Sequence, residues 1–168
     1  MKLDSVEKIF RVLNAAGVQY LVAGGLAVNA HGYLRFTKDV DFVIRLLPEN
    51  IRRAFVALEG LGYRPNVPVT GEQFADAEQR QRWIEEKGMQ VLQLWSDVHR
   101  ETPIDIFVTE PFPFEAEYQH ALVKPLYREV EVRFVSIPTL ISMKEVAGRP
   151  QDRIDIDNLR RLQEEGDG

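Results

Sequence analysis

The segment DVDFVIRL, residues 39–46, constrains the fold of this chain more than any other, because apolar and polar residues alternate along it. Side chains alternate between the two faces of a β-strand, so the pattern predicts a strand with one apolar face and one face that carries Asp39 and Asp41. The segment PIDIFV, residues 103–108, repeats the pattern with Asp105 on its polar face. The chain must therefore fold around strands that place carboxylates opposite a buried face.

Asp39, Asp41 and Asp105 are the candidate catalytic residues, and each also has a simpler explanation. A D-x-D pair is often a solvated strand face, and Asp105 could point outward from an edge strand. Against this, a free carboxylate is costly within strands as apolar as these. Mg²⁺ or Mn²⁺, which takes oxygen ligands, would relieve the repulsion within the acidic pair. If the two strands are neighbours, three carboxylates converge as the ligand set of a two-metal displacement at phosphorus.

Gly24 and Gly25 stand between residues 19–23, an expected buried strand, and residues 26–31, an expected short helix. Glycines at such a junction let backbone N–H groups approach a phosphate, and the N-terminus of the helix favours an anion. A Gly-Gly pair alone is more often only a turn. Here Asp39 follows Gly25 by 14 residues, and this combination is far more specific.

The remaining segments predict helices interspersed with strands. The expected helices are residues 4–16, 48–58, 72–87, 138–147 and 150–163, and the expected further strands are residues 89–95, 121–127 and 129–137, the last two as a hairpin or two short strands. The aromatic, Pro-interrupted segment 111–120 is predicted to be irregular. We interpret His31 as structural, and Trp83 and Trp95 as core or partly exposed aromatics rather than base-stacking platforms.

Length and composition narrow the function classes. The 168 residues fit a single domain, and the absence of cysteine excludes a disulfide framework, a thiolate metal site and a cysteine nucleophile. No apolar run approaches the roughly 18 residues needed to span a bilayer, and the N-terminus MKLDSVEKIF is too charged for a secretory signal. We therefore expect a cytoplasmic protein with no membrane partner. The net charge of -5 argues mildly against broad coating of nucleic acid.

The stretch GGLAVNAHGYLRFTKDVDFVI, residues 24–44, resembles the signature of the DNA polymerase β-type nucleotidyltransferase superfamily. That signature is a Gly-Gly or Gly-Ser turn, a short helix, D-x-D on a strand and a third Asp on a later strand; the matching residues are Gly24, Gly25, Asp39, Asp41 and Asp105. The R-x-T-x-D-x-D spacing, with Arg35 and Thr37, most resembles the AbiEii-type group, which contains toxins of toxin–antitoxin systems. The segment MKEVAGRPQDRIDIDNL is similar to that group's late motif, with matching residues Lys144, Arg149, Asp152 and Asp155.

The resemblance implies an α/β (α+β) fold, with a mixed β-sheet and helices packed against it. It further implies one nucleotidyltransferase-like domain over residues 1–168, whose C-terminal helices, about 138–164, pack on it. The implied reaction moves a nucleoside monophosphate from an NTP to a hydroxyl acceptor. By this analogy Asp39 and Asp41 hold the metals, and Asp105 completes one metal site and helps to deprotonate the acceptor. Gly24 and Gly25 would cradle the β and γ phosphates.

Three further residues are predicted to bind nucleotide by the same resemblance, and each has an alternative. Lys144 would contact the triphosphate, or else be a solvated helix lysine. Arg35 would bind phosphate, or pair with a carboxylate such as Asp39. Thr37 would orient an Asp by a hydrogen bond, or else have only a structural role in the loop or at the start of the strand. Arg149 has the same two explanations as Arg35, its alternative being an ion pair with Asp152 or Asp155.

The acceptor is left open between RNA (tRNA-like), protein and a small molecule. A toxin with an antitoxin protein as its partner is one possibility, and an antibiotic-type small-molecule transferase is another. The alternative from a different class is a catalytically silent member that binds nucleotide or a partner chain. The presence of all three acids and of the Gly-Gly pair counts against silence.

Overall fold

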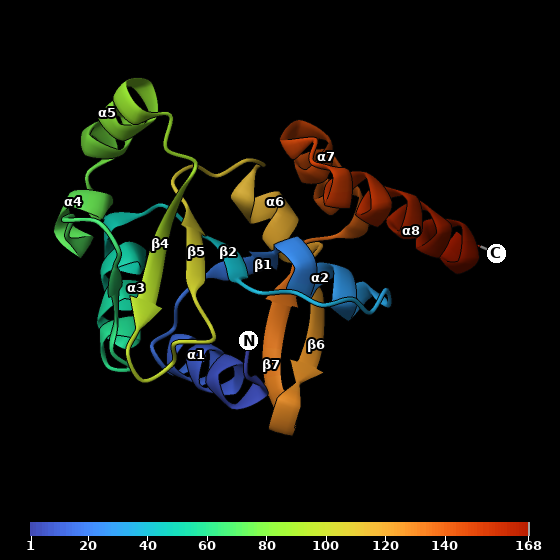
Figure 1. The fold of residues 1–168 in the computed structure, drawn as a ribbon, viewed down its shortest axis with the longest axis horizontal. Coiled ribbons are helices and arrows are strands. Elements are labelled where there is room, and N and C mark those ends of the chain that lie inside the picture. Colours follow the sequence, from blue (N-terminus) through green and yellow to red (C-terminus); the bar gives the residue numbers. More distant parts are fainter. Residues whose placement is uncertain (168) are drawn as a thin grey trace.

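A seven-stranded mixed sheet forms the centre of the protein, as seen in a computed structural model that describes residues 1–167 (Figure 1). The strand order is β3-β4-β5-β2-β1-β7-β6. The strands are β1 (Tyr20–Ala23), β2 (Val40–Ile44), β3 (Tyr63–Pro65), β4 (Val91–Ser96), β5 (Ile104–Phe107), β6 (Leu122–Leu126) and β7 (Val130–Phe134). This architecture confirms the predicted class, a mixed sheet with helices packed against it.

Eight α-helices surround this sheet in the described part of the chain. They are α1 (Leu3–Ala15), α2 (Gly24–His31), α3 (Pro48–Glu59), α4 (Gly71–Ala75), α5 (Ala77–Lys87), α6 (Phe114–Gln119), α7 (Ile137–Ala147) and α8 (Pro150–Asp167). A single 3-10 turn, η1 (Tyr127–Glu129), joins β6 to β7. None of the described helices is long and apolar enough to cross a membrane.

Strand β2 lies inside the sheet and has a different orientation relative to each neighbour. It runs antiparallel to β1 and parallel to β5, and β4 runs antiparallel to β5. The alternation that predicted β2 and β5 has a direct physical counterpart, because the even-numbered residues of both strands are fully buried. Phe42 on β2 packs against Phe10 of α1, with ring centroids 6.3 Å apart. The odd-numbered residues, Asp41 among them, therefore face away from α1.

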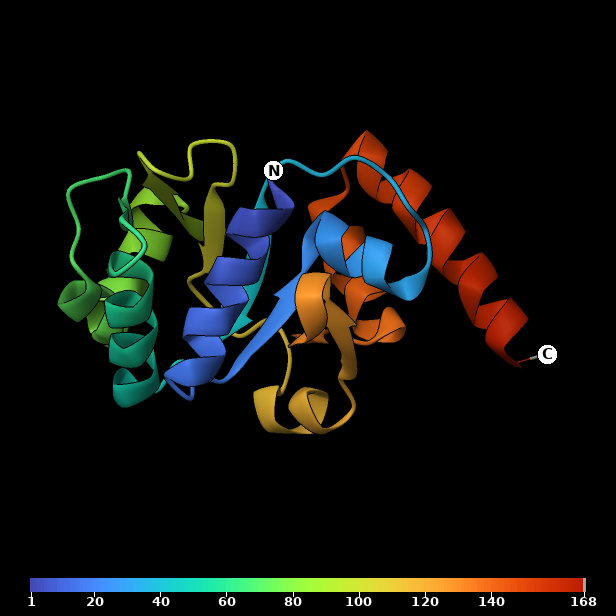
Figure 2. The same ribbon diagram turned by 90° about the horizontal axis from the view of Figure 1, so that it is seen from below.

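Helices α1 and α3 lie on the same side of the sheet, and this side holds the main core. The apolar stripe of α1 and that of α3 are buried, and the two helices also contact each other. Figure 2 shows both helices on the side of the strands opposite the segment that leads from α2 to β2. The sheet therefore has one face built for packing, and a second face on which polar side chains of β2, β4 and β5 lie.

Three segments differ from the sequence-based expectation. The segment 111–120, predicted to be irregular, contains helix α6, because Phe114 and Glu117 supply one buried face. Glu117 accepts hydrogen bonds from the Ser136 N–H (2.7 Å) and the Thr139 hydroxyl (2.6 Å), so it caps the start of α7. The segment 72–87 forms two helices rather than one, since Asp76 leaves the helical conformation and caps α5 through the N–H groups of its first turn. The short strand β3 was not predicted.

The C-terminal helices α7 and α8 form a hairpin that packs against α2 (Figure 1). Both were predicted, and α8 continues beyond the expected end at Gln163 to Asp167. Gly148 ends α7 with a left-handed backbone (φ 63°), the conformation that glycine adopts without strain. This hairpin brings the late sequence motif beside the Gly-Gly turn.

Candidate active site

Asp41 and Asp105 face each other across two adjacent parallel strands. The register pairs Asp41 of β2 with Asp105 of β5, Ala23 of β1 with Asp41, and Gln93 of β4 with Asp105. All four residues therefore lie in one row across the sheet, and the two carboxylates project from the same face. The Gln93 side-chain amide donates a hydrogen bond of 3.1 Å to Asp105. The condition for convergence, that the two strands be neighbours, is met.

The electrostatics of this row disfavour two free carboxylates. Burial, and after it the negative charges of Asp105 and Asp39, raise the pKa of Asp41 to about 8. Burial also raises the pKa of Asp105, although the hydrogen bond from Gln93 opposes this. Arg149 acts in the opposite direction on both carboxyl groups. A positive charge placed between the two side chains would allow both to ionise.

Asp39 precedes β2 and contributes the third carboxylate. Among the side chains that the structure describes, its Oδ1 is the one buried polar atom without a hydrogen-bond partner. A buried carboxylate oxygen without a partner is costly, and a cation is one group that would satisfy it. The oxygen donors of these acids are the kind that Mg²⁺ and Mn²⁺ prefer. The donor set thus fits a divalent cation, although no three His, Asp or Glu side chains of the described chain are already grouped around one metal position.

Gly24 and Gly25 are glycines for a steric reason that the sequence alone does not reveal. Gly24 has a left-handed backbone (φ 63°), and a Cβ atom at this position would collide with the carboxylate of Asp41. A Cβ on Gly25 would lie 2.5 Å from the hydroxyl oxygen of Thr37. Helix α2 begins at Gly24. Its first N–H groups therefore start beside the acidic row, where a helix N-terminus favours an anion.

Arg35 and Lys144 meet on the carboxylate of Asp155. Arg35 donates two hydrogen bonds of 2.8 Å to Asp155, one to each oxygen. Lys144 lies 2.7 Å from Asp155 and 3.4 Å from Asp152, and the side chains of Lys144 and both acids are almost completely buried. Arg149 in turn pairs with Asp152 at 2.9 Å. Together these residues form an ion-pair network that joins the segment before β2 to α7 and α8.

This network decides between several alternatives from the sequence. Arg35 does pair with a carboxylate, but its partner is Asp155 and not Asp39. Lys144 is buried, so the alternative of a solvated lysine is wrong. Burial alone would raise the pKa of Asp155, but hydrogen bonds from Arg35, Lys144 and Gln151 hold it below its ordinary value. In this structure both predicted nucleotide-binding cations are engaged within the protein.

Thr37 and His31 lie close to the site without contacting its carboxylates. The Thr37 hydroxyl donates a long hydrogen bond of 3.5 Å to the backbone carbonyl of Asp39, so it bonds the main chain of an acid and not its side chain. His31 Nε2 lies 2.7 Å from the carbonyl oxygen of Val135, which agrees with the structural role expected for it. Burial lowers the pKa of His31, although the hydrogen bond to the Val135 carbonyl opposes this shift.

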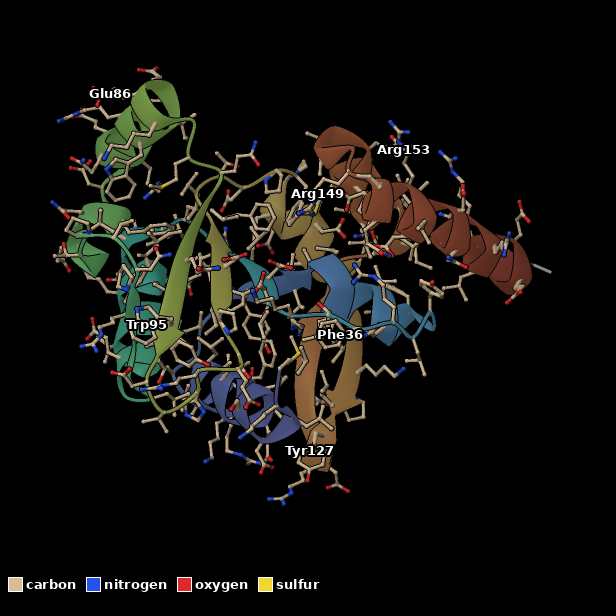
Figure 3. The ribbon with its side chains drawn as sticks, in the orientation of Figure 1. Phe36, Glu86, Trp95, Tyr127, Arg149 and Arg153 are labelled. Carbon is tan, nitrogen blue, oxygen red and sulfur yellow. The ribbon has the colours of Figure 1, made fainter. Side chains whose placement is uncertain are left out.

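Sequence reasoning missed one functional candidate, Gln93, and one effect of another, Arg149. Gln93 was only one polar residue within an expected strand, and its contact with Asp105 depends on the pairing of β4 with β5. An ion pair with an acidic residue was one of the two explanations of Arg149 and is present, yet Arg149 also influences the charge state of the carboxylates in the row. Figure 3 places Arg149 at the junction of α7 and α8, with its side chain largely exposed.

This fold, with two acids on adjacent strands and a third just before one of them beside a glycine turn, is shared with solved structures of nucleotidyltransferases. The solution structure of the antibiotic-resistance factor ANT(2'')-Ia has a TM-score of 0.60 at 16% identity and covers 99% of this chain and 84% of its own. The lincosamide antibiotic adenylyltransferase LnuA, with lincomycin bound, has a TM-score of 0.60 at 15% identity and covers 92% of this chain and 93% of its own. An antigenic nucleotidyltransferase-like protein from Paracoccidioides brasiliensis has a TM-score of 0.55 at 14% identity, with 95% and 74% covered. No protein-family model and no curated protein matches the sequence.

Proposed function

We propose that this protein is a metal-dependent nucleotidyltransferase that moves a nucleoside monophosphate from an NTP to a hydroxyl acceptor. The observation that carries the proposal is the pairing of Asp41 with Asp105 on adjacent strands, next to Gly24. A side chain at Gly24 would displace the carboxylate of Asp41. A purely structural pair of acids needs no such close approach of the backbone. The solved structures with the same fold include enzymes named as adenylyltransferases, which supports the same chemistry here.

The residues take the following roles. Asp39, Asp41 and Asp105 would hold Mg²⁺ or Mn²⁺, and such an ion, when bound, neutralises charge on the triphosphate. The N–H groups at Gly24 and Gly25 would contact the β and γ phosphates. Arg35 and Thr37 hold the segment that leads to Asp39, and Lys144 adds positive charge from α7. These three complete the proposed nucleotide-binding set.

The chemistry then requires few groups from the protein. The acceptor oxygen forms a bond to the α-phosphorus, the bond from this phosphorus to the bridging oxygen of the leaving group breaks, and pyrophosphate departs. The hydroxyl proton passes to Asp105, which lies on the side of the row that faces β4. Most of the rate gain in such a reaction comes from positioning and from charge stabilisation.

The acceptor class belongs to the proposal and not to the fold. The fold relatives include proteins whose structures contain adenylyl-2''-tobramycin and lincomycin, so a small molecule is one option. RNA (tRNA-like) or protein is the option that follows from the AbiEii-type motif, with a toxin role and an antitoxin as its protein partner. A cytoplasmic location fits each of these acceptors.

A thermal-shift experiment tests the nucleotide site. Mg²⁺ or Mn²⁺ with a saturating NTP, at about 100 times its dissociation constant, should stabilise the protein by roughly 2.7 kcal/mol. For a domain of this size that corresponds to a rise in Tm of roughly 5–10 °C. Asp41→Ala should remove the gain, whereas Asp157→Ala, an exposed acid on α8, should keep it.

A labelling experiment tests the transfer itself. The protein is incubated with each α-labelled NTP, a divalent cation and fractionated cell extract, and the labelled acceptor class is identified. Transfer with one NTP that depends on Asp105 supports the proposal. Binding of NTP without transfer, with every NTP and both metals, would instead assign the protein to the catalytically silent alternative.

A further inference from the structure

The sheet face that carries Asp41 and Asp105 continues over β4 and β3. Along β4, Leu92, Leu94 and Ser96 are buried against the core, while Gln93 and Trp95 point to the opposite face. Gln93 lies in the row of the two acids and donates its hydrogen bond to Asp105. Asn66, just after β3, donates a hydrogen bond of 3.2 Å to the side-chain oxygen of Gln93. The row of polar groups therefore extends from the acids to the edge of the sheet.

Trp95 is a large aromatic side chain beside this row. It is 38% exposed, which is a high fraction for a residue that usually buries most of its surface. Arg64 on β3 is its register partner, and the guanidinium lies 5.7 Å from the centre of the indole ring. Extended by one residue beyond the paired strands, the register places Trp95 in the row that contains Asp39, two strands away, so their backbones are about 10 Å apart at the usual strand spacing. Figure 3 shows Trp95 on β4.

The charges around Trp95 distinguish between classes of acceptor. Arg64 lies 3.1 Å and Arg100 3.7 Å from the same carboxylate, that of Asp97. Proteins that stack single-stranded nucleic acid combine aromatic side chains with a positively charged groove for the phosphates. Here both arginines already share an acid, and the whole chain carries a net charge of -5. This surface suits an uncharged or cationic ligand better than a polyanion.

We propose that Trp95, Gln93 and Asn66 form the acceptor platform, which binds a sugar or cyclitol ring and presents one of its hydroxyl groups to Asp105. This inference rests on the proposed function, since the acceptor hydroxyl must reach the row in which Asp41 and Asp105 lie. The indole offers an apolar surface against the face of the ring. The two amide side chains provide both donors and acceptors, which is what a polyhydroxylated ring requires. A small-molecule acceptor follows from this chemistry.

Intrinsic fluorescence tests the platform directly, because the chain has two tryptophans. Trp83 is buried against Phe74, whereas Trp95 is exposed, so Trp83→Phe leaves only the platform residue as a reporter. Tobramycin, lincomycin and a single-stranded 12-nucleotide RNA serve as probes, each with Mg²⁺ and a non-hydrolysable NTP analogue. We expect a saturable change in emission with at least one ring compound for Trp83→Phe and none for Trp95→Phe.

Kinetics provide the second measurement, with the labelled NTP and the ring compound that binds. Trp95→Ala should raise the KM for the acceptor at least tenfold and leave the KM for the NTP within twofold. Tyr127→Ala is the matched control, since Tyr127 has the same exposure at the far edge of the sheet and should change neither value (Figure 3).

The outcomes separate this inference from the proposed function. If RNA changes the emission of Trp95 and neither ring compound does, the platform serves a different acceptor and the inference is overturned. It is also overturned if no probe changes the emission of Trp95 while Mg²⁺ and NTP still raise the Tm of the wild type but not of Asp41→Ala. The nucleotide site would then be intact, and only the acceptor platform would be wrong. Loss of that Tm shift in the wild-type protein would contradict the proposed function itself.

Discussion

Replacing Asp155 with Asn should destabilise the protein more than any exposed acidic substitution on the same helix. The Asp155 side chain is fully buried and holds two cations at once, Arg35 through two hydrogen bonds and Lys144 at 2.7 Å. An amide of the same shape keeps the packing but removes the negative charge. The substitution therefore isolates the electrostatic contribution of this one carboxylate.

The magnitude follows from what remains after the substitution. Removing one partner of a buried ion pair typically costs about 3–5 kcal/mol, because the other charge stays buried. Lys144 keeps Asp152 at 3.4 Å, and the Arg35 side chain is 19% exposed, so water can partly replace the lost partner. We therefore expect the lower end of this range, about 3 kcal/mol, which corresponds to a fall in Tm of roughly 6–12 °C.

Urea unfolding followed by circular dichroism measures this loss, with Asp157→Asn as the control. Asp157 is exposed on the same helix, and its substitution should change the free energy of unfolding by less than about 0.5 kcal/mol. The pKa of Asp155 is lowered in the folded protein, so its stabilising effect is fully present above its ordinary pKa of about 4 and is lost progressively as the pH falls from there through the lowered pKa. The difference between wild type and Asp155→Asn should therefore shrink in acid. Equal losses for the two variants at pH 7, or a difference that does not change between pH 7 and pH 3, would refute the reasoning.

Three further substitutions have distinct expected outcomes. Gly24→Ala should abolish the NTP-dependent rise in Tm, because the added Cβ collides with Asp41 and the left-handed backbone is strained; a retained shift would show that the close approach is not needed. Asp41→Asn should raise the Tm of the metal-free protein at pH 7 by the equivalent of at least about 1–2 kcal/mol, since a carboxyl group whose pKa rises to about 8 on folding lowers the stability at neutral pH and an amide does not; an unchanged or lower Tm in EDTA would contradict this. Asp76→Ala removes the cap of α5 and should cost about 1 kcal/mol in urea unfolding, without changing NTP binding.

The sequence predicted the strands of the site well, because their signal is local. The alternation in residues 39–46 and 103–108 reports directly which side chains are buried, and the structure buries the expected faces. The adjacency of Asp41 and Asp105 was only conditional, since they are 64 residues apart and no local pattern specifies which strands pair. Gln93 was missed for the same reason.

Helix α6, the break between α4 and α5, and one ion pair were not predicted, because the local sequence around them favours another structure or gives no indication. Aromatic residues and prolines in 111–120 masked helix α6, whose buried face needs only Phe114 and Glu117. In the sequence, Asp76 is one of many polar residues in a segment predicted to be a single helix. In the structure it is the N-cap of α5 and separates α4 from α5. The pairing of Arg35 with Asp155 spans 120 residues. No local sequence pattern indicates that a loop arginine and a helical aspartate so far apart form an ion pair. This contact is visible only in the folded structure.

That partnership has a consequence for how the protein can be shortened or divided. Arg35 lies four residues before Asp39, and its ion-pair partner Asp155 lies on α8. The C-terminal helical hairpin therefore holds the segment that leads to Asp39 in place. A chain cut at the turn before Pro150 would leave Arg35 and Lys144 without their shared anion. Figure 1 shows α8 extending away from the sheet, yet its removal would take away the anchor of the segment before β2.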